Sequence, residues 1–188
     1  MKIETKLIHF SKGIILESGE KLDSFDLMVE TYGNLNENKS NAILLCHAFS
    51  GNHHAAGKND DFGVGWWDQL VGPDKPIDTN KYFVVCCNNL GGCAGSSGPA
   101  STNSSSGKVF GKSFPQVSVL DWVNSQKMLM DELNIDYWHF VAGGSLGGMQ
   151  ALQWSISYPD KVKKAGIFAA AAKARSQNIA MNEVARES

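Results

Sequence analysis

A serine flanked by glycines, between a short apolar run and a helical pattern, is the feature that most constrains this chain. Ser145 stands in the run Ala-Gly-Gly-Ser-Leu-Gly-Gly, which fits Gly-x-Ser-x-Gly through Gly143 and Gly147. Residues 138–142 are predicted to form a buried strand, and residues 149–158 a helix that a proline ends. A serine on a sharp strand-to-helix turn is a nucleophile elbow, in which side chains two positions away on either side would collide.

The same turn predicts an oxyanion hole. The backbone N–H of Leu146 and the start of the helix would face the serine hydroxyl, where negative charge develops during acyl transfer. In a fold with this elbow, the second N–H comes from the loop after an earlier core strand, and we assign it to Phe49. The alternative is a tight glycine-rich loop without a catalytic role, which the flanking strand and helix disfavour.

The rest of the chain predicts an α/β fold with a mostly parallel sheet. Residues 3–32 alternate apolar and polar side chains between glycines, which indicates an antiparallel β-meander. Apolar runs typical of strands buried on both faces of a parallel sheet follow at 42–46, 81–87, 138–142 and 164–169. Alternating strands and helices imply that helices cover the sheet and that the crossovers are right-handed.

One helix is predicted between the second and third of these apolar strands. Ser118 can cap its start, with Asp121 three residues on as the capping-box partner. From there, side chains at helical spacing form one mostly apolar face as far as Leu133.

Composition limits the classes of partner. With 188 residues, 43% hydrophobic and 19% charged, the chain resembles a soluble protein with one well-formed core. A net charge of -2 gives no electrostatic reason to expect nucleic acid or an anionic membrane. No apolar stretch approaches the roughly 18 residues of a membrane span, and the first residues lack the apolar core of a signal peptide. We therefore expect a cytoplasmic protein.

The four cysteines show no metal or disulfide pattern. Cys46, Cys86 and Cys87 are predicted to be buried thiols, and the last two should point to opposite faces of one strand. Cys93 lies in a glycine-rich loop, where a reactive thiol stays possible. The adjacent pair His53 and His54 has no further ligand at suitable spacing, so we expect no metal site.

His47, His139 and one run that resembles a phosphate loop are the remaining candidates for a chemical role. His47, at the end of an apolar strand, is either a base or, as we favour, a residue that fixes its loop through a ring N–H. His139 is expected inside a strand without a catalytic role. The run from Gly107 to Ser113 is one residue too short for a phosphate loop, so nucleotide binding is rejected.

Two loop segments carry alternative interpretations. In residues 91–112, 12 of 22 residues are Gly or Ser, which indicates either a flexible linker or an ordered loop at the carboxyl end of a core strand. Trp66 and Trp67 form an aromatic pair that either anchors a long loop on the core or lines an acyl or pantetheine channel.

Several separate stretches together resemble the homoserine O-acyltransferases of the α/β-hydrolase superfamily, in family order from about residue 5 onward. They are residues 30–33, 45–51, 65–68, 72–79, 89–93, 95–99, 143–150 and 178–186. The resemblance implies an acyl-CoA co-substrate with no further cofactor, L-homoserine as acceptor, Ser145 as the acylated nucleophile and a place in methionine biosynthesis. It also implies that residues 91–112 form an ordered loop of the site.

The resemblance indicates the identity of the acyl group less strongly than that of the acceptor. Residues 52–57 and 177–180 look more like family members that use succinyl-CoA than those that use acetyl-CoA, so succinyl is favoured and acetyl stays open. A homodimer is expected for the full-length protein.

The catalytic triad is incomplete in this sequence. In this fold the order is Ser, then Asp or Glu, then His, yet none of the five histidines follows Ser145. Asp160 follows the elbow helix too closely to serve as the acid. We therefore expect residues 1–175 to form the N-terminal part of the core domain, residues 176–188 to begin a helical lid, and the chain alone to be nearly inactive. A serine esterase or thioesterase, or a non-catalytic fragment, are the alternatives.

Overall fold

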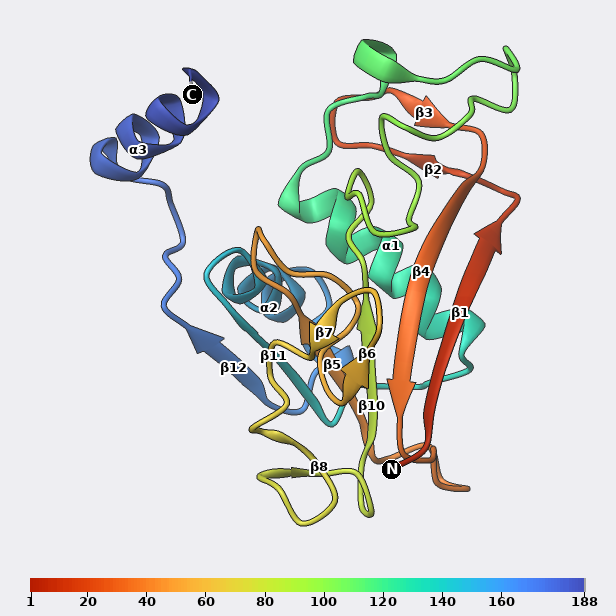
Figure 1. Cartoon of the computed structure of the whole chain (residues 1–188), viewed down its shortest axis with the longest axis vertical. Helices are drawn as coiled ribbons and strands as arrows, with labels where there is room; N and C mark the ends of the chain where they lie inside the picture. Colours follow the sequence, from red (N-terminus) through yellow and green to blue (C-terminus); the bar gives the residue numbers. More distant parts are fainter. Residues whose placement is uncertain (188) are drawn as a thin grey trace.

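The computed structural model describes residues 1–187, and its centre is a mixed sheet of six strands (Figure 1). The strands lie in the order β1 (Ile3–Phe10), β4 (Phe25–Tyr32), β10 (Phe83–Cys87), β5 (Ala42–Cys46), β11 (Phe140–Gly144) and β12 (Ala165–Phe168). β4 runs antiparallel to both of its neighbours, whereas β10, β5, β11 and β12 are parallel to one another. The predicted α/β class with an antiparallel N-terminal part is confirmed.

Three two-stranded ribbons and three α-helices complete the fold of the described residues. The ribbons are β2 (Ile14–Ile15) with β3 (Lys21–Leu22), β6 (Lys58–Asn59) with β7 (Gly63–Val64), and β8 (Val71–Gly72) with β9 (Ile77–Asp78). The α-helices are α1 (Val119–Glu132), α2 (Leu146–Ser157) and α3 (Ser176–Glu187), and short 3-10 turns occupy Gly111–Ser113 and Pro159–Lys161. The meander therefore consists of β1 paired with β4 along their whole lengths, with the β2–β3 ribbon between them in sequence.

The two faces of the sheet are covered differently. On β5, Leu44 and Cys46 face a core built with α1 and α2, whereas Ile43 and Leu45 face a second core. That second core is closed by residues 55–82, which carry β6 to β9 and the tryptophan pair. The expectation that helices cover the sheet thus holds for one face within residues 1–187, and a long loop segment covers the other.

Helix α1 begins where its capping residues predict. The Ser118 hydroxyl accepts a hydrogen bond from the Asp121 N–H at 3.3 Å, and the Asp121 carboxylate accepts one from the Ser118 N–H at 2.8 Å. The second carboxylate oxygen of Asp121 accepts from the N–H of Glu17 at 2.8 Å. The cap therefore also ties the helix start to the segment after β2.

Several boundaries differ from the predictions. β10 begins two residues after Lys81, and β11 begins at Phe140, so Trp138 and His139 precede the strand. The prediction that His139 lies inside a strand is therefore wrong; its ring packs 5.4 Å from that of Tyr82. Helix α2 begins directly after Ser145, three residues before the predicted start at residue 149. Gly147 and Gly148 belong to the helix despite their low helix propensity, because packing around the elbow determines their conformation.

The chain ends in a helix that stands apart from the sheet (Figure 1). Residues 171–187, including all of α3, are exposed. Residues 176–187 of the expected lid form this helix, Ser188 lies outside the described residues, and the lid role stays a prediction. Between residues 1 and 187, no helix combines the length and apolar character that crossing a membrane requires.

Candidate active site

Ser145 occupies a sharp turn between β11 and α2. Its φ of 55° and ψ of -119° are unusual for a residue other than glycine, and its side chain is exposed. The Ser145 N–H donates to the carbonyl oxygen of Phe168 at 3.0 Å, which ties the turn to the adjacent strand β12. Such backbone strain persists only where the surroundings hold it in place, and it is concentrated at functional sites.

The glycines around the serine are required by close packing. A Cβ on Gly143 would lie 2.3 Å from the carbonyl carbon of Gly147, and a Cβ on Gly147 would lie 1.9 Å from the carbonyl oxygen of Cys46. By contrast, a Cβ on Gly144 would meet no heavy atom within 4 Å. The two glycines of the motif therefore let β11, α2 and the end of β5 approach one another closely.

His47 fixes the loop that carries Phe49. The ring Nδ1 lies 2.8 Å from the carbonyl oxygen of Ala48, and Nε2 accepts a hydrogen bond from the N–H of Asn89 at 3.1 Å. The acceptor role of Nε2 places the ring proton on Nδ1, so both nitrogens are engaged. Burial lowers the pKa of His47 below its ordinary 6.5, so the ring is neutral at pH 7. The predicted structural contact through a ring N–H is confirmed.

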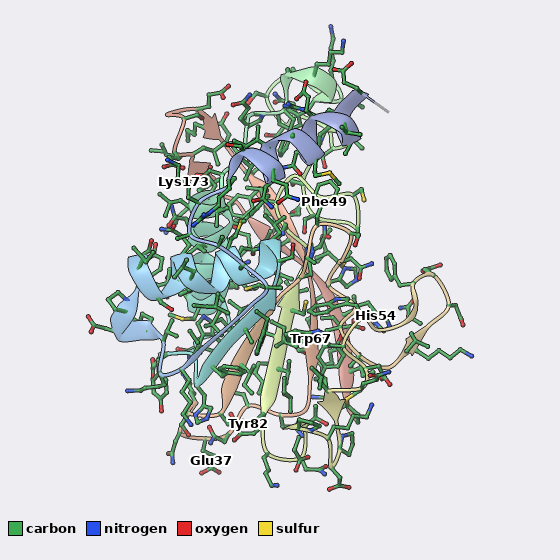
Figure 2. All side chains as sticks on the ribbon, turned by 90° about the vertical axis from the view of Figure 1, so that its left-hand side faces the viewer. Glu37, Phe49, His54, Trp67, Tyr82 and Lys173 are labelled. Carbon is green, nitrogen blue, oxygen red and sulfur yellow. The ribbon has the colours of Figure 1, made fainter. Side chains whose placement is uncertain are left out.

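Phe49 and Leu146 line one cavity beside the elbow. Its volume is about 370 Å³, and its walls come from the loops after β5 and β10, the start of α1 and the start of α2. The Phe49 side chain is 89% exposed (labelled in Figure 2), so its conformation is not fixed by a core. The structure thus brings the two residues assigned to the oxyanion hole to one cavity, and their donor role stays a prediction.

A buried polar cluster that the sequence did not reveal holds the far end of the same loop. Glu30 on β4 accepts a hydrogen bond from the Tyr32 hydroxyl at 2.8 Å and lies 2.8 Å from Nδ1 of His54. The Tyr32 oxygen in turn accepts from the N–H groups of Ala55 and Ala56 at 2.7 and 3.1 Å. The only sequence signal was the spacing of Glu30 and Tyr32 at alternate positions, which places both side chains on one face of β4.

His54 therefore pairs with a carboxylate instead of pointing to a metal. Within the described part of the chain, no group of three or more His, Cys, Asp or Glu side chains is placed to hold a metal ion.

The glycine-rich segment after β10 is ordered where it meets the sheet. The Ser96 hydroxyl accepts from the Met28 N–H at 2.9 Å and donates to the carbonyl oxygen of Asn88 at 2.6 Å. Ser97 exchanges two hydrogen bonds with Asp26, at 2.8 and 2.9 Å. These contacts continue the pairing along β4 beyond the end of β10, and they identify this part of residues 91–112 as an ordered loop instead of a tether.

The tryptophan pair anchors the long loop on the second core. Trp66 donates its indole N–H to the carbonyl oxygen of Asn52 at 2.9 Å, and its ring lies 5.0 Å from that of Trp67. Both side chains are half-buried against the second core, away from the cavity that Phe49 lines. The anchoring interpretation is therefore the one the contacts support.

The cysteines lie as their pattern predicts. Cys46, Cys86 and Cys87 are buried free thiols, and Cys93 is exposed. Cys86 and Cys87 belong to the two different cores, and hence to opposite faces of β10. Burial raises the pKa of Cys87 to about 12, so this thiol stays protonated.

Comparison with known proteins agrees with this geometry. A family profile described as "alpha/beta hydrolase fold" matches residues 41–185. The homoserine O-succinyltransferase of Hahella chejuensis is 58% identical over 187 residues, which is 98% of this chain and 49% of that protein. The chain spans about half the length of the curated relatives it matches.

Solved structures of both transferases and hydrolases are similar. A homoserine O-acetyltransferase from Bacillus anthracis matches with a TM-score of 0.81 and 37% identity, covering 88% of this chain and 46% of that one. An acetylester hydrolase from Corynebacterium glutamicum matches with a TM-score of 0.83 and 31% identity, covering 98% and 49%. Together with the elbow and the mixed sheet, the profile match shows that this chain belongs to the α/β-hydrolase fold family.

Proposed function

We propose that this chain carries the nucleophile of an acyltransferase that moves an acyl group from acyl-CoA to the hydroxyl of L-homoserine, in methionine biosynthesis. Succinyl is the favoured acyl group and acetyl the alternative. The observation that carries the proposal is the exposed Ser145 on its strained elbow, beside a cavity lined by Phe49 and Leu146. The 58% identity to a protein named homoserine O-succinyltransferase supports the choice of acceptor and acyl group.

The proposed reaction has two steps. Ser145 Oγ attacks the thioester carbonyl, its proton passes to a base, and the CoA thiolate leaves as the protonated thiol. The homoserine hydroxyl then attacks the acyl-serine ester, which releases the O-acyl product and restores the serine. The N–H groups of Leu146 and Phe49 would stabilise the oxyanion in both steps, each contributing about 3 kcal/mol.

The base and the triad acid are proposed to lie outside these 188 residues. His47 lines the cavity beside the elbow, and both of its ring nitrogens are engaged. Since no histidine follows Ser145, the chain alone lacks a general base in the usual order of this fold. A serine without its base loses most of the triad's contribution, so we expect very low activity from the isolated chain.

An acylation experiment tests the nucleophile. The purified chain is incubated with succinyl-CoA, acetyl-CoA or a p-nitrophenyl ester as an activated donor, and the adduct is located by peptide mass spectrometry. We expect a slow, single acylation on Ser145 and none in Ser145→Ala. Acylation of other residues to the same extent in Ser145→Ala would contradict the proposal.

Hydrolysis is the second candidate, favoured by the likeness to an acetylester hydrolase. The two functions differ in what removes the acyl group from Ser145. A transferase loses the adduct faster when L-homoserine is added and forms O-acylhomoserine, whereas an esterase loses it to water at a rate that homoserine does not change. No adduct with any donor would leave the non-catalytic interpretation.

A further inference from the structure

One edge of the six-stranded sheet is exposed along its whole length. Among the described residues β1 pairs with β4 alone, and Figure 1 shows it as the outermost strand on that side of the sheet. The Gly33 N–H donates to the carbonyl oxygen of Lys2 at 3.0 Å, so the even-numbered residues that follow in β1 direct their backbone groups toward β4. The backbone N–H and carbonyl groups of Ile3, Thr5 and Leu7 therefore point outward, away from β4.

The side chains along this edge form two rows of different character. One row is charged, because the carboxylate oxygens of Glu4 lie 2.6 Å from Nζ of Lys2 and 2.7 Å from Nζ of Lys6. The other row, on the opposite face, is apolar: the side chains of Ile3 and Leu7 are 39% and 55% exposed. Exposed apolar side chains on an edge strand favour pairing with another chain.

The pattern of β1 is complementary to itself under a two-fold rotation. A second β1 that runs antiparallel about an axis at Thr5 sets the two Thr5 residues opposite each other, and Ile3 of each chain opposite Leu7 of the other. The same register sets Glu4 of each chain opposite Lys6 of the other, in the pairs whose side chains approach most closely. Opposite charges and apolar side chains directly across an antiparallel ladder stabilise it.

The charged row also disfavours the neighbouring symmetric registers. An axis at Glu4 would set the two Glu4 carboxylates opposite each other and Lys2 opposite Lys6, and an axis at Lys6 would set the two Lys6 ammonium groups opposite each other. Like charges directly across a ladder destabilise it. Charges on an edge strand usually prevent pairing, but here their alternation permits the register centred on Thr5.

We propose that β1 is a self-association surface, through which two copies of this chain pair their β1 strands about Thr5 and form one continuous sheet. The pairing covers the exposed side chains of Ile3 and Leu7 in both copies and gives the outward backbone groups of β1 their partners. The inference does not depend on the proposed function, because β4, β10 and β5 separate β1 from the strand that leads to Ser145.

Cysteine cross-linking tests the register directly. Every chain carries Cys93→Ser, because Cys93 is exposed whereas the other cysteines are buried. Ile3→Cys and Leu7→Cys chains are prepared separately, mixed and treated with oxidised glutathione. In the proposed register these two positions face each other with Cα atoms about 5.5 Å apart, a separation that a disulfide spans. We expect the mixture to form a disulfide-linked heterodimer, identified by mass spectrometry.

Each cysteine chain oxidised alone is the matched control. Two copies of position 3, or two copies of position 7, lie four residues apart along the paired strands, or about 14 Å at about 3.4 Å per residue. Each chain alone should therefore cross-link about tenfold more slowly than the mixture, or less. Equal rates for the mixture and the separate chains would mean random collision and would overturn the inference.

Charge reversal tests the same register without cysteine. The Kd of the dimer is measured by sedimentation velocity over a range of chain concentrations. Lys6→Glu sets like charges opposite each other at two symmetric positions, so the Kd should rise about tenfold or more, and Glu4→Lys combined with Lys6→Glu should largely restore it. Lys112→Glu makes the same change of net charge on an exposed 3-10 turn and should leave the Kd unchanged.

Three outcomes of the sedimentation experiment would contradict the proposal. They are a parent chain that stays monomeric at every concentration, equal Kd values for Lys6→Glu and Lys112→Glu, and no recovery in the doubly reversed chain. A dimer that Phe168→Asp disrupts and Lys6→Glu does not would assign the interface to β12, the opposite edge of the sheet, and would likewise overturn the assignment to β1.

Discussion

The close packing of Gly147 makes the elbow's stability a sharp test of the geometry. In Gly147→Ala the new Cβ would lie 1.9 Å from the carbonyl oxygen of Cys46 and 3.0 Å from that of His47, where ordinary contact begins at 3.4 Å. Both neighbours are backbone atoms at the end of the central strand β5, so no side-chain rotation can relieve the clash. Either α2 or β5 must move, which disturbs the first core on which both elements pack.

Overpacking of this kind costs about 3 kcal/mol, the upper part of the range for one inserted methyl group. For a domain of this length, each kcal/mol lowers the Tm by about 2–4 °C, so we expect a decrease of about 6–12 °C. Urea unfolding followed by circular dichroism gives the free energy of unfolding, and a thermal scan gives the Tm.

Gly144→Ala is the matched control within the same motif. Its Cβ would enter open space, and Gly144 has no positive φ, so we expect the free energy of unfolding to stay within about 0.5 kcal/mol of the parent or to rise slightly. Equal effects of the two substitutions, or a Gly147→Ala chain as stable as the parent, would refute the argument that packing against β5 requires this glycine.

Three further substitutions or conditions probe other contacts. Burial lowers the pKa of His47 below 6.5, so the stabilisation that its neutral form gives is fully present above pH 6.5 and decreases as the pH drops below that value. Urea unfolding between pH 7.5 and 5 should therefore show a smaller decrease in the free energy of unfolding for His47→Gln than for the parent. Asp121→Ala should lower the free energy of unfolding by about 2 kcal/mol, because a helix cap and a buried acceptor are lost. Asp131→Ala is the control: Asp131 is exposed, so the same assay should show a decrease in the free energy of unfolding of under about 0.5 kcal/mol. Gln126→Leu leaves the indole N–H of buried Trp154 without its acceptor and should cost about 2 kcal/mol, with a changed near-ultraviolet circular dichroism spectrum.

Features that depend on neighbouring residues were predictable from the sequence. The capping box of α1 and the elbow at Ser145 are both local patterns, and both appear at the predicted residues. The apolar runs correctly predicted β5, β10 and β11, because a strand buried on both faces carries mostly apolar side chains. The same pattern was wrong about burial at β12, where Ala165, Ile167 and Phe168 are exposed. The boundaries near glycines were wrong by two or three residues, since the packing of β5 against the elbow overrides the low helix propensity of glycine.

The side-chain pairings and the cavity depend on contacts between distant parts of the chain. The sequence by itself fixed the type and order of the elements and the position of the serine, because hydrophobic periodicity and turn chemistry act over a few residues. Only the tertiary structure decided that Glu30 would pair with His54, 24 residues later, and that His47 would hold the N–H of Asn89, 42 residues later. It also decided that Phe49 and Leu146 would line one cavity, because the loops after strands separated in sequence meet at the same edge of one sheet.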